Sequence, residues 1–235
     1  MKRSILILVI LMSSFLIPQA QAEIGKLEPI DDSSPLIQAV RAHLKAYQDN
    51  DQNSLLGRQT KLLNEITQEV SAQPTQRMNA LIGSAQLKGV RFITNDRAWV
   101  EASIPEQPDF TGFYFIKEDG VWKSAHLKWY NWKVHKDLDS IVKAIGDYNN
   151  DNEKLPQTLN DLLAKPYIVN IPVDPYNENG APYVYKVISK NNCRIYSIGP
   201  DSKDDGGEKE YEETKKNPPP LSEGDIIKQY SGMNE

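Results

Sequence analysis

The sequence predicts an α+β fold made of two small domains, and three observations lead to this prediction. Apolar residues recur first at helical spacing and then alternate as in strands. Near residue 137 helical spacing returns, and a second set of alternating segments follows it. Charge divides the chain at the same place, because residues 23–136 hold 14 basic and 14 acidic residues, whereas residues 137–235 hold 11 basic and 18 acidic ones.

The first 22 residues have the pattern of a Sec signal peptide. Lys2 and Arg3 precede an apolar stretch over residues 5–17, and Ala20-Gln21-Ala22 matches the small-x-small cleavage rule. This stretch is shorter than the roughly 20 residues that a spanning helix needs. We therefore expect cleavage after Ala22, no stable membrane span afterwards, and a periplasmic or secreted location.

The first domain, residues 23–136, is expected to start with helices and to continue as a four-stranded meander. Ser34-Pro35 is a helix start, with Ser34 as N-cap, and apolar helical faces follow over residues 37–48 and 55–70. Alternation predicts strands over residues 87–94, 98–102, 111–117 and 121–128. We expect the helices to pack on one face of this sheet.

The second domain, residues 137–235, is expected to combine a helix with a small antiparallel sheet. Leu138, Ile141 and Ile145 share one helical face, which ends at the polar residues 149–152. A short helix over residues 158–163 and strands over 183–188 and 193–198 follow. Cys193 is the one cysteine, so it forms no internal disulfide and is expected to be buried.

The order of elements over about residues 36–132 resembles the NTF2-like (SnoaL-like) superfamily, as does the closing segment FYFIKEDGVWKSA. The resemblance implies a module of helices on a curved antiparallel sheet. Its members include enzymes as well as binding and dimerisation modules. A pair of His126 with Asp96 or Glu101 is the acid–base arrangement to consider, and a surface or satisfied histidine is the alternative. The sequence has no nucleophile elbow, P-loop or zinc spacing, so we expect no enzyme and no catalytic residue.

The second half resembles the C-terminal domain of the type II secretion major pseudopilin. Four partial motif matches occur in order, at residues 148–156, at residues 171–176 with 182–185, at residues 197–201 with Gly206-Gly207, and at Asp225-Ile226. The chain departs from the family in three ways. It lacks the long apolar helix that builds the pilus shaft, it inserts residues 177–181 in a turn, and it lengthens the acidic loop, residues 199–225. The resemblance therefore implies a stand-alone pseudopilin-like head.

Pseudopilin heads bind calcium in the loop that corresponds to residues 199–225. The resemblance implies ligands at Asp201, at Asp225 and at the Ile198 carbonyl, and Asp204 and Asp205 are further candidates in the loop. Calcium takes six to eight oxygen ligands, and Gly206-Gly207 allows the backbone to fold tightly around an ion. The alternative is a solvated loop without an ion, since the segment also holds four lysines and Pro218-Pro219-Pro220.

These patterns lead us to expect an exported, non-enzymatic structural or binding protein of the cell envelope with a calcium-stabilised head. A protein partner in the envelope and an association with type II secretion are expected, and nucleic acid is disfavoured by the acidic second half. The alternative is an NTF2-like small-molecule-binding protein or enzyme with the head as an accessory. Aromatic residues gather near the domain junction, where they indicate packing or a partner groove, namely Tyr114, Trp122, Trp129, Tyr130 and Trp132.

Overall fold

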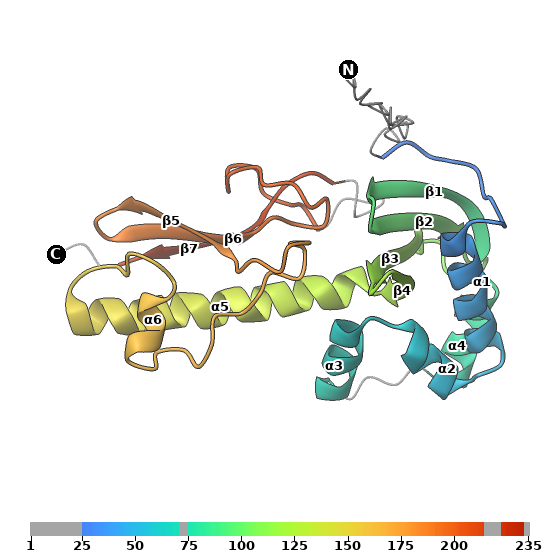
Figure 1. Cartoon of the computed structure of the whole chain (residues 1–235), viewed down its shortest axis with the longest axis horizontal. Coiled ribbons are helices and arrows are strands. Elements are labelled where there is room, and N and C mark those ends of the chain that lie inside the picture. The colour runs from blue at the N-terminus through green and yellow to red at the C-terminus, as the bar shows by residue number, and fades with distance from the viewer. Residues whose placement is uncertain (1–24, 71–74, 214–221, 233–235) are drawn as a thin grey trace, which may run out of the picture.

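Helices and two antiparallel sheets build the chain, which confirms the predicted α+β class (Figure 1). The structure is a computed structural model and describes residues 25–70, 75–213 and 222–232. The predicted signal peptide, residues 1–22, lies outside these ranges. Among the helices in them, none has the length and apolar character that crossing a membrane requires.

Four helices precede the first sheet. They are α1 (Pro35–Gln48), α2 (Gln52–Arg58), α3 (Lys61–Glu69) and α4 (Gln76–Gly83). The Ser34 side chain accepts a hydrogen bond from the Ile37 amide and caps α1, as the sequence predicts. The single helix predicted over residues 55–70 is wrong, because Thr60 accepts from the Leu63 amide and starts a new helix, α3. Helix α4, capped by Thr75, was not predicted.

The first sheet has the order β1-β2-β3-β4, with β1 (Gln86–Thr94), β2 (Arg97–Ser103), β3 (Gly112–Glu118) and β4 (Val121–Ala125). Both of its faces are covered, which corrects the expectation of helices on one face. Val40 of α1 packs on one face with Val100 and Phe115. Trp99 and Tyr114 point to the other face, where residues of α3 and α5 cover them.

Helix α5 (Leu127–Asn152) is continuous over 26 residues and connects the two halves of the molecule. It begins ten residues before the predicted start at Asp137, and β4 ends at Ala125 rather than at residue 128. Its early buried residues, Leu127, Tyr130 and Val134, follow helical spacing, so residues 127 and 128, predicted as the end of a strand, belong to the helix. The domain boundary predicted at residues 136 and 137 therefore lies inside α5.

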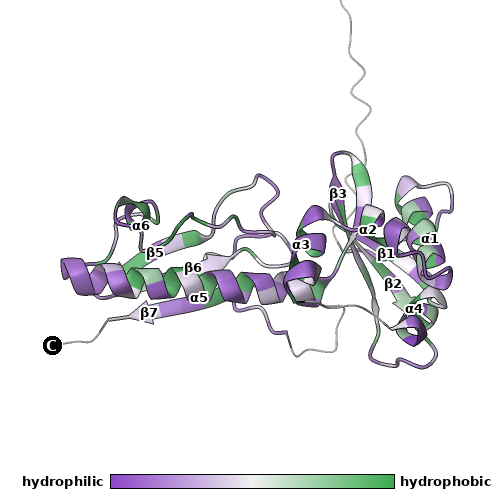
Figure 2. Ribbon diagram, turned by 90° about the horizontal axis from the view of Figure 1, so that it is seen from below, coloured by the Kyte–Doolittle hydropathy of each residue, from purple (hydrophilic) through white to green (hydrophobic). Residues whose placement is uncertain are grey.

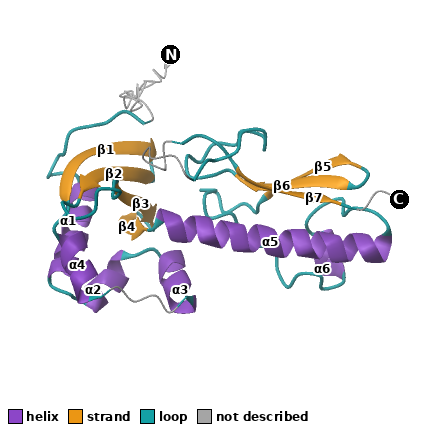
Figure 3. Ribbon diagram, turned by 180° about the vertical axis from the view of Figure 1, so that it is seen from behind, coloured by secondary structure: helices purple, strands orange, loops and turns teal. Residues whose placement is uncertain are grey.

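The second sheet, of order β5-β6-β7, packs along the C-terminal part of α5 (Figure 3). Its strands are β5 (Val184–Ser189), β6 (Asn192–Ser197) and β7 (Ile226–Ser231), of which β7 was not predicted. The short helix α6 (Asp161–Ala164) lies beside α5. Hydrophilic and hydrophobic residues alternate along α5 in Figure 2, as expected for a helix with one buried face.

One apolar cluster extends from the first sheet along α5 into the second sheet. It includes Trp99 and Tyr114 of the first sheet, Leu138 and Ile141 of α5, and the buried, free Cys193 of β6. Because this core is continuous, the two halves share α5 as a common packing element and form an elongated molecule (Figure 1).

Candidate cation site in the acidic loop

The acidic loop begins where β6 ends and returns to the sheet at β7. Two backbone hydrogen bonds close it, from the Tyr211 amide to the Asp225 carbonyl (2.8 Å) and from the Asp225 amide to the Lys209 carbonyl (2.7 Å). Gly199 has a φ of 72°, and a Cβ there would lie 2.2 Å from the Gly224 carbonyl oxygen. The start and the end of the loop are therefore in direct backbone contact, and that contact requires glycine.

Asp225 is fully buried at the base of the loop. Its carboxylate accepts hydrogen bonds from the amides of Gly207 (2.7 Å) and Asp205 (3.4 Å). Burial raises its pKa to about 6, and the charges of Asp204 and Asp205 act in the same direction. Asp225 therefore organises the Gly206-Gly207 turn, and the negative charges of Asp204 and Asp205 act on its carboxylate.

Asp201 lies at the start of the loop and is only 6% exposed. Its Oδ1 accepts from the Lys203 amide, whereas its buried Oδ2 has no hydrogen-bond partner. Burial raises the pKa of Asp201 to about 6, and the Asp205 carboxylate adds to the effect. A buried carboxylate oxygen without a donor is unfavourable, and either protonation of the carboxylate or a bound cation relieves the cost.

Asp205 and Asp204 differ in their surroundings. One oxygen of Asp205 is buried without a partner, as is the hydroxyl of Ser202. Asp204 is exposed, and its Oδ1 accepts from the Tyr196 hydroxyl (2.9 Å) and from the Gly206 amide (2.8 Å). Asp205 thus belongs with Asp201 electrostatically, while Asp204 is held at the outside of the loop.

The donors in this loop fit a hard cation. Carboxylate, hydroxyl and carbonyl oxygens are the ligands that calcium prefers, and three buried side-chain oxygens of Asp201, Ser202 and Asp205 are unpartnered. No three His, Cys, Asp or Glu side chains in the described ranges are gathered closely enough to hold a metal by themselves. An ion here would consequently need backbone oxygens as well, of which the Ile198 carbonyl is the predicted one.

A turn at residues 174–178 supports the start of the loop and was missed as a functional element. The Asp174 carboxylate accepts from the Tyr176 amide, from the Ser197 hydroxyl (2.8 Å) and from the Ile198 amide (3.0 Å). The sequence signal was the D-P-Y motif, in which a short acidic side chain bonds the backbone two residues ahead. Asp174 therefore fixes Ile198, whose carbonyl is a predicted ligand.

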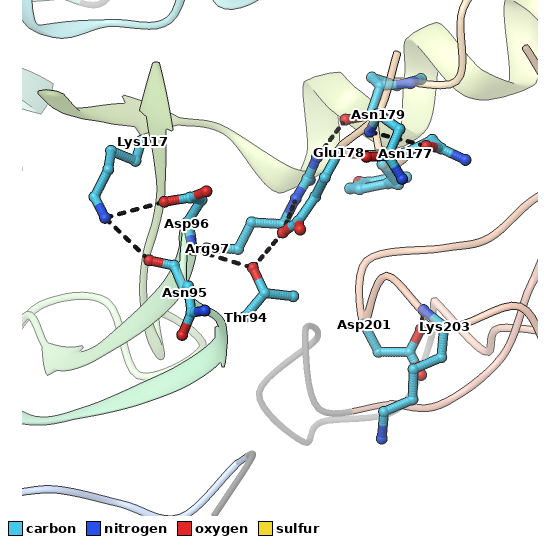
Figure 4. A network of polar contacts seen from close by, with 12 residues as sticks. Thr94, Asn95, Asp96, Arg97, Lys117, Asn177, Glu178, Asn179, Asp201 and Lys203 are labelled. Atoms are coloured by element: carbon cyan, nitrogen blue, oxygen red, sulfur yellow. Dashed lines mark hydrogen bonds and ion pairs between the residues drawn. The ribbon is translucent and has the colours of Figure 1, made fainter. Parts of the chain in front are cut away.

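The same turn contacts the first sheet (Figure 4). Glu178 accepts a hydrogen bond from Thr94 and pairs with Arg97, whose Nε lies 3.4 Å from the Glu178 Oε1. Arg97 also donates to the Tyr114 hydroxyl (3.0 Å) and to the Pro175 carbonyl (3.1 Å). Residues from both halves of the chain thus meet around one nearly buried guanidinium.

Asp96 and Glu101, the two carboxylates considered as acid–base partners of His126, each form an ion pair with a cation of the first sheet. Asp96 pairs with Lys117 (3.0 Å) and Glu101 pairs with Arg91 (2.6 Å). His126 lies beside Trp129 at the start of α5. These carboxylates are engaged with cations in the first sheet.

Most of the junction aromatics serve packing. Tyr114 and Tyr130 are buried and meet edge to face, and the Tyr130 hydroxyl lies 2.8 Å from Thr60 Oγ1. Trp132 is half-buried and borders a shallow hollow of about 490 Å³ along α5 with Lys136 and Lys143. A second hollow, of about 220 Å³, lies between α5 and the start of β7. Neither hollow is lined by strands of the first sheet.

Comparison of the chain with protein-family models, with curated proteins and with solved structures gives no match. The resemblances to the NTF2-like superfamily and to the major pseudopilin therefore remain predictions from sequence motifs.

Proposed function

We propose that this chain is an exported, non-enzymatic structural or binding protein of the cell envelope, with a pseudopilin-like head that calcium stabilises. One observation carries the proposal. The acidic loop holds buried carboxylate oxygens of Asp201 and Asp205 without partners, next to the buried Asp225. Burying ionised groups in this way is unfavourable without a counter-charge, and a divalent cation supplies one.

The proposed ligands are the side chains of Asp201, Asp205 and Asp225 and the Ile198 carbonyl. Calcium bound there neutralises the clustered carboxylates and joins the two ends of the acidic loop. Asp204 is assigned a structural role, because its hydrogen bonds to Tyr196 and Gly206 direct it to the outside of the loop.

The path of α5 supports a stand-alone head. In the pseudopilin family, the helix beneath the head continues into an apolar shaft. Here the N-terminal turns of α5 instead pack on the first sheet through Leu127, Tyr130 and Val134. A helix committed to a folded module is unsuited to a pilus core, so we assign the chain a binding or assembly role, in association with type II secretion and with a protein partner in the envelope.

The packing of the first half favours a non-enzymatic role over a small-molecule site. The space between α1 and the first sheet is filled by Leu36, Ile37, Val40 and Phe115, all nearly inaccessible. An NTF2-like enzyme or binding protein needs a cleft with converging polar groups at such a place. This packing supports the leading proposal.

Thermal unfolding of the chelator-treated protein, with and without added CaCl₂, tests the calcium site. Calcium at 100 times its Kd is expected to add about 2.7 kcal/mol to the free energy of unfolding, and hence to raise Tm. Asp201→Ala should lose most of this increase, and Asp204→Asn, as the matched control in the same loop, should keep it. A wild-type Tm that does not respond to calcium would refute the site.

Export is tested separately by N-terminal sequencing of the protein recovered from the periplasm and the medium. The mature chain is expected to begin at Glu23. Recovery only from the cytoplasm, with Met1 retained, would contradict export without bearing on the calcium site.

A further inference from the structure

The turn at residues 174–178 connects the acidic loop with the first sheet. At its first residue, the Asp174 carboxylate holds Ser197 and the Ile198 amide (3.0 Å). At the next residue, the Pro175 carbonyl accepts from Arg97 of β2. Two consecutive residues of this turn are therefore bonded to different parts of the molecule, Asp174 to the end of β6 just before the acidic loop and Pro175 to the first sheet.

The residues that lengthen this turn provide its outer contact with the first sheet. Glu178 lies within the insertion at residues 177–181, by which the chain departs from the pseudopilin pattern. Figure 4 shows Glu178 between Thr94, from which it accepts a hydrogen bond, and Arg97, with which it forms an ion pair. The Arg97 Nε lies 3.4 Å from the Glu178 Oε1. A shorter turn without this insertion lacks the carboxylate that reaches the β1–β2 hairpin.

Arg97 makes this contact energetically demanding. Its side chain is 5% exposed, and its charge depends on Glu178, the Tyr114 hydroxyl and the Pro175 carbonyl for compensation. A buried guanidinium that loses its partners is strongly unfavourable. The Nε of Arg97 makes no hydrogen bond, so its charge relies on the ion pair with Glu178 and on the two bonds made by its other nitrogens. Displacing the turn removes Glu178 and Pro175 from Arg97 and releases Ile198 together.

We propose that Arg97 and Glu178 are positioning residues for the calcium site, so that ion binding in the acidic loop and docking of the head on the first sheet stabilise each other. This inference rests on the proposed calcium site. The docked turn holds the Ile198 carbonyl in place before the ion arrives. An ion bound at that carbonyl in turn restrains Asp174 and Pro175 and keeps Arg97 paired.

Linkage makes the proposal quantitative. If calcium favours the docked turn, loss of docking must weaken calcium binding by the same factor. Coupling between sites is typically worth at least fivefold in affinity. We expect Glu178→Gln to raise the calcium Kd about fivefold and Arg97→Lys to raise it by more, because Arg97 makes the additional bond to Pro175.

Isothermal titration of the chelator-treated full chain with CaCl₂ measures these constants. Glu101→Gln is the matched control, because Glu101 also pairs with an arginine of the first sheet, Arg91, at 2.6 Å. It should bind calcium as the wild type does. Hydrogen exchange adds a readout that general destabilisation does not reproduce, since CaCl₂ should slow exchange at the amides of Tyr176 and Arg97 in the wild type.

The outcomes separate the coupling from the site itself. Suppose that the wild type binds calcium, that Glu178→Gln and Arg97→Lys bind it with the same Kd, and that calcium does not change exchange at Tyr176. This result would overturn the coupling but would leave the calcium site unchallenged. A wild type that binds no calcium would overturn both. If Arg97→Lys does not fold, Glu178→Gln and Thr94→Val provide the same measurement, because both remove contacts of a partly exposed carboxylate.

Discussion

Asp201→Asn is expected to stabilise the protein in the absence of calcium and to abolish its response to calcium. Burial raises the pKa of Asp201 from 3.8 to about 6, so the ionised carboxyl is less favourable in the folded chain than in the unfolded one. The stability gained from the protonated form is fully present below pH 3.8 and is lost as the pH rises through about 6. Near neutral pH, the calcium-free wild type therefore carries an electrostatic penalty that asparagine removes.

The magnitude follows from the pKa and from the local contacts. At about 1.4 kcal/mol per pKa unit, the shift is worth at most about 3 kcal/mol. Solvent screening reduces this figure. The asparagine NH₂ takes the place of an oxygen that has no partner, so the substitution breaks no hydrogen bond of that atom. A net gain of about 1 kcal/mol remains, which corresponds to an increase in Tm of roughly 2–4 °C for a chain of this size.

The assay is differential scanning fluorimetry at about pH 7, in a chelator and in CaCl₂. In the chelator, Asp201→Asn should melt above the wild type, and in CaCl₂ it should melt below it. Asp204→Asn should follow the wild type in both buffers. An Asp201→Asn variant that is less stable than the wild type in the chelator, or that still gains Tm with calcium, would refute the reasoning.

Three further predictions concern the core, the loop backbone and the unity of the fold. His43 is buried beside Tyr47 and Phe115, and burial lowers its pKa to about 4, so its contribution to stability is lost as the pH falls from about 6.5 towards 4. In urea unfolding, wild type should lose about 2 kcal/mol more than His43→Leu between pH 7 and pH 5, because the opposing contributions of Asp201 and Asp225 are common to both. The variant His135→Gln, at a half-buried histidine, should behave as wild type. Gly199→Ala should destabilise the protein and remove the calcium response, because the new Cβ would clash with the Gly224 carbonyl oxygen. Gly180 has a similar φ but open space around it, so Gly180→Ala should lower the free energy of unfolding by only about 1–2 kcal/mol in the same assay. Ile141→Ala should lower the free energy of unfolding by about 2–5 kcal/mol. Because one core links both halves, the urea midpoints followed by tryptophan fluorescence and by Cys193 thiol labelling should shift by equal amounts, and unequal shifts would show independent units.

Much of the local structure followed from short-range signals. Ser34-Pro35 gave the start of α1, and the alternation around Val90, Val100 and Phe115 gave three strands in their places. These signals are local because capping and strand alternation depend on neighbouring residues. The split between α2 and α3 was missed, since Thr60 caps a helix within an otherwise continuous apolar pattern.

The start of α5 was missed for a different reason. Trp129, Tyr130 and Trp132 are aromatic residues that favour strands, and they follow β4 directly. Burial against the first sheet and α3 decides the outcome in favour of a helix, and such tertiary burial is not encoded in a local window. The boundary predicted at residue 137 followed the change in charge composition there, but the helical backbone continues through that position.

The candidate site shows the same division between local and non-local information. Asp201 and Asp225 were predicted from their motif positions, and Asp204 and Asp205 were further candidates in the loop. The structure places Asp201 and Asp225 near the start and the end of that loop, which are in backbone contact. Arg97 was not identified, because nothing in the segment Asp96-Arg97-Ala98 distinguishes a buried, bridging arginine from an exposed one.

The position of Arg97 explains a structural role of residues 177–181, which supply the carboxylate that pairs with it. Under the proposed function, the pseudopilin-like head has no shaft helix and lies beside the first sheet instead. The inserted Glu178 compensates the buried charge of Arg97, and the Asp174 end of the same turn supports Ile198. The turn at residues 174–178 therefore joins the first sheet through Glu178 and Pro175, and through Asp174 it also holds Ile198, the residue before the acidic loop.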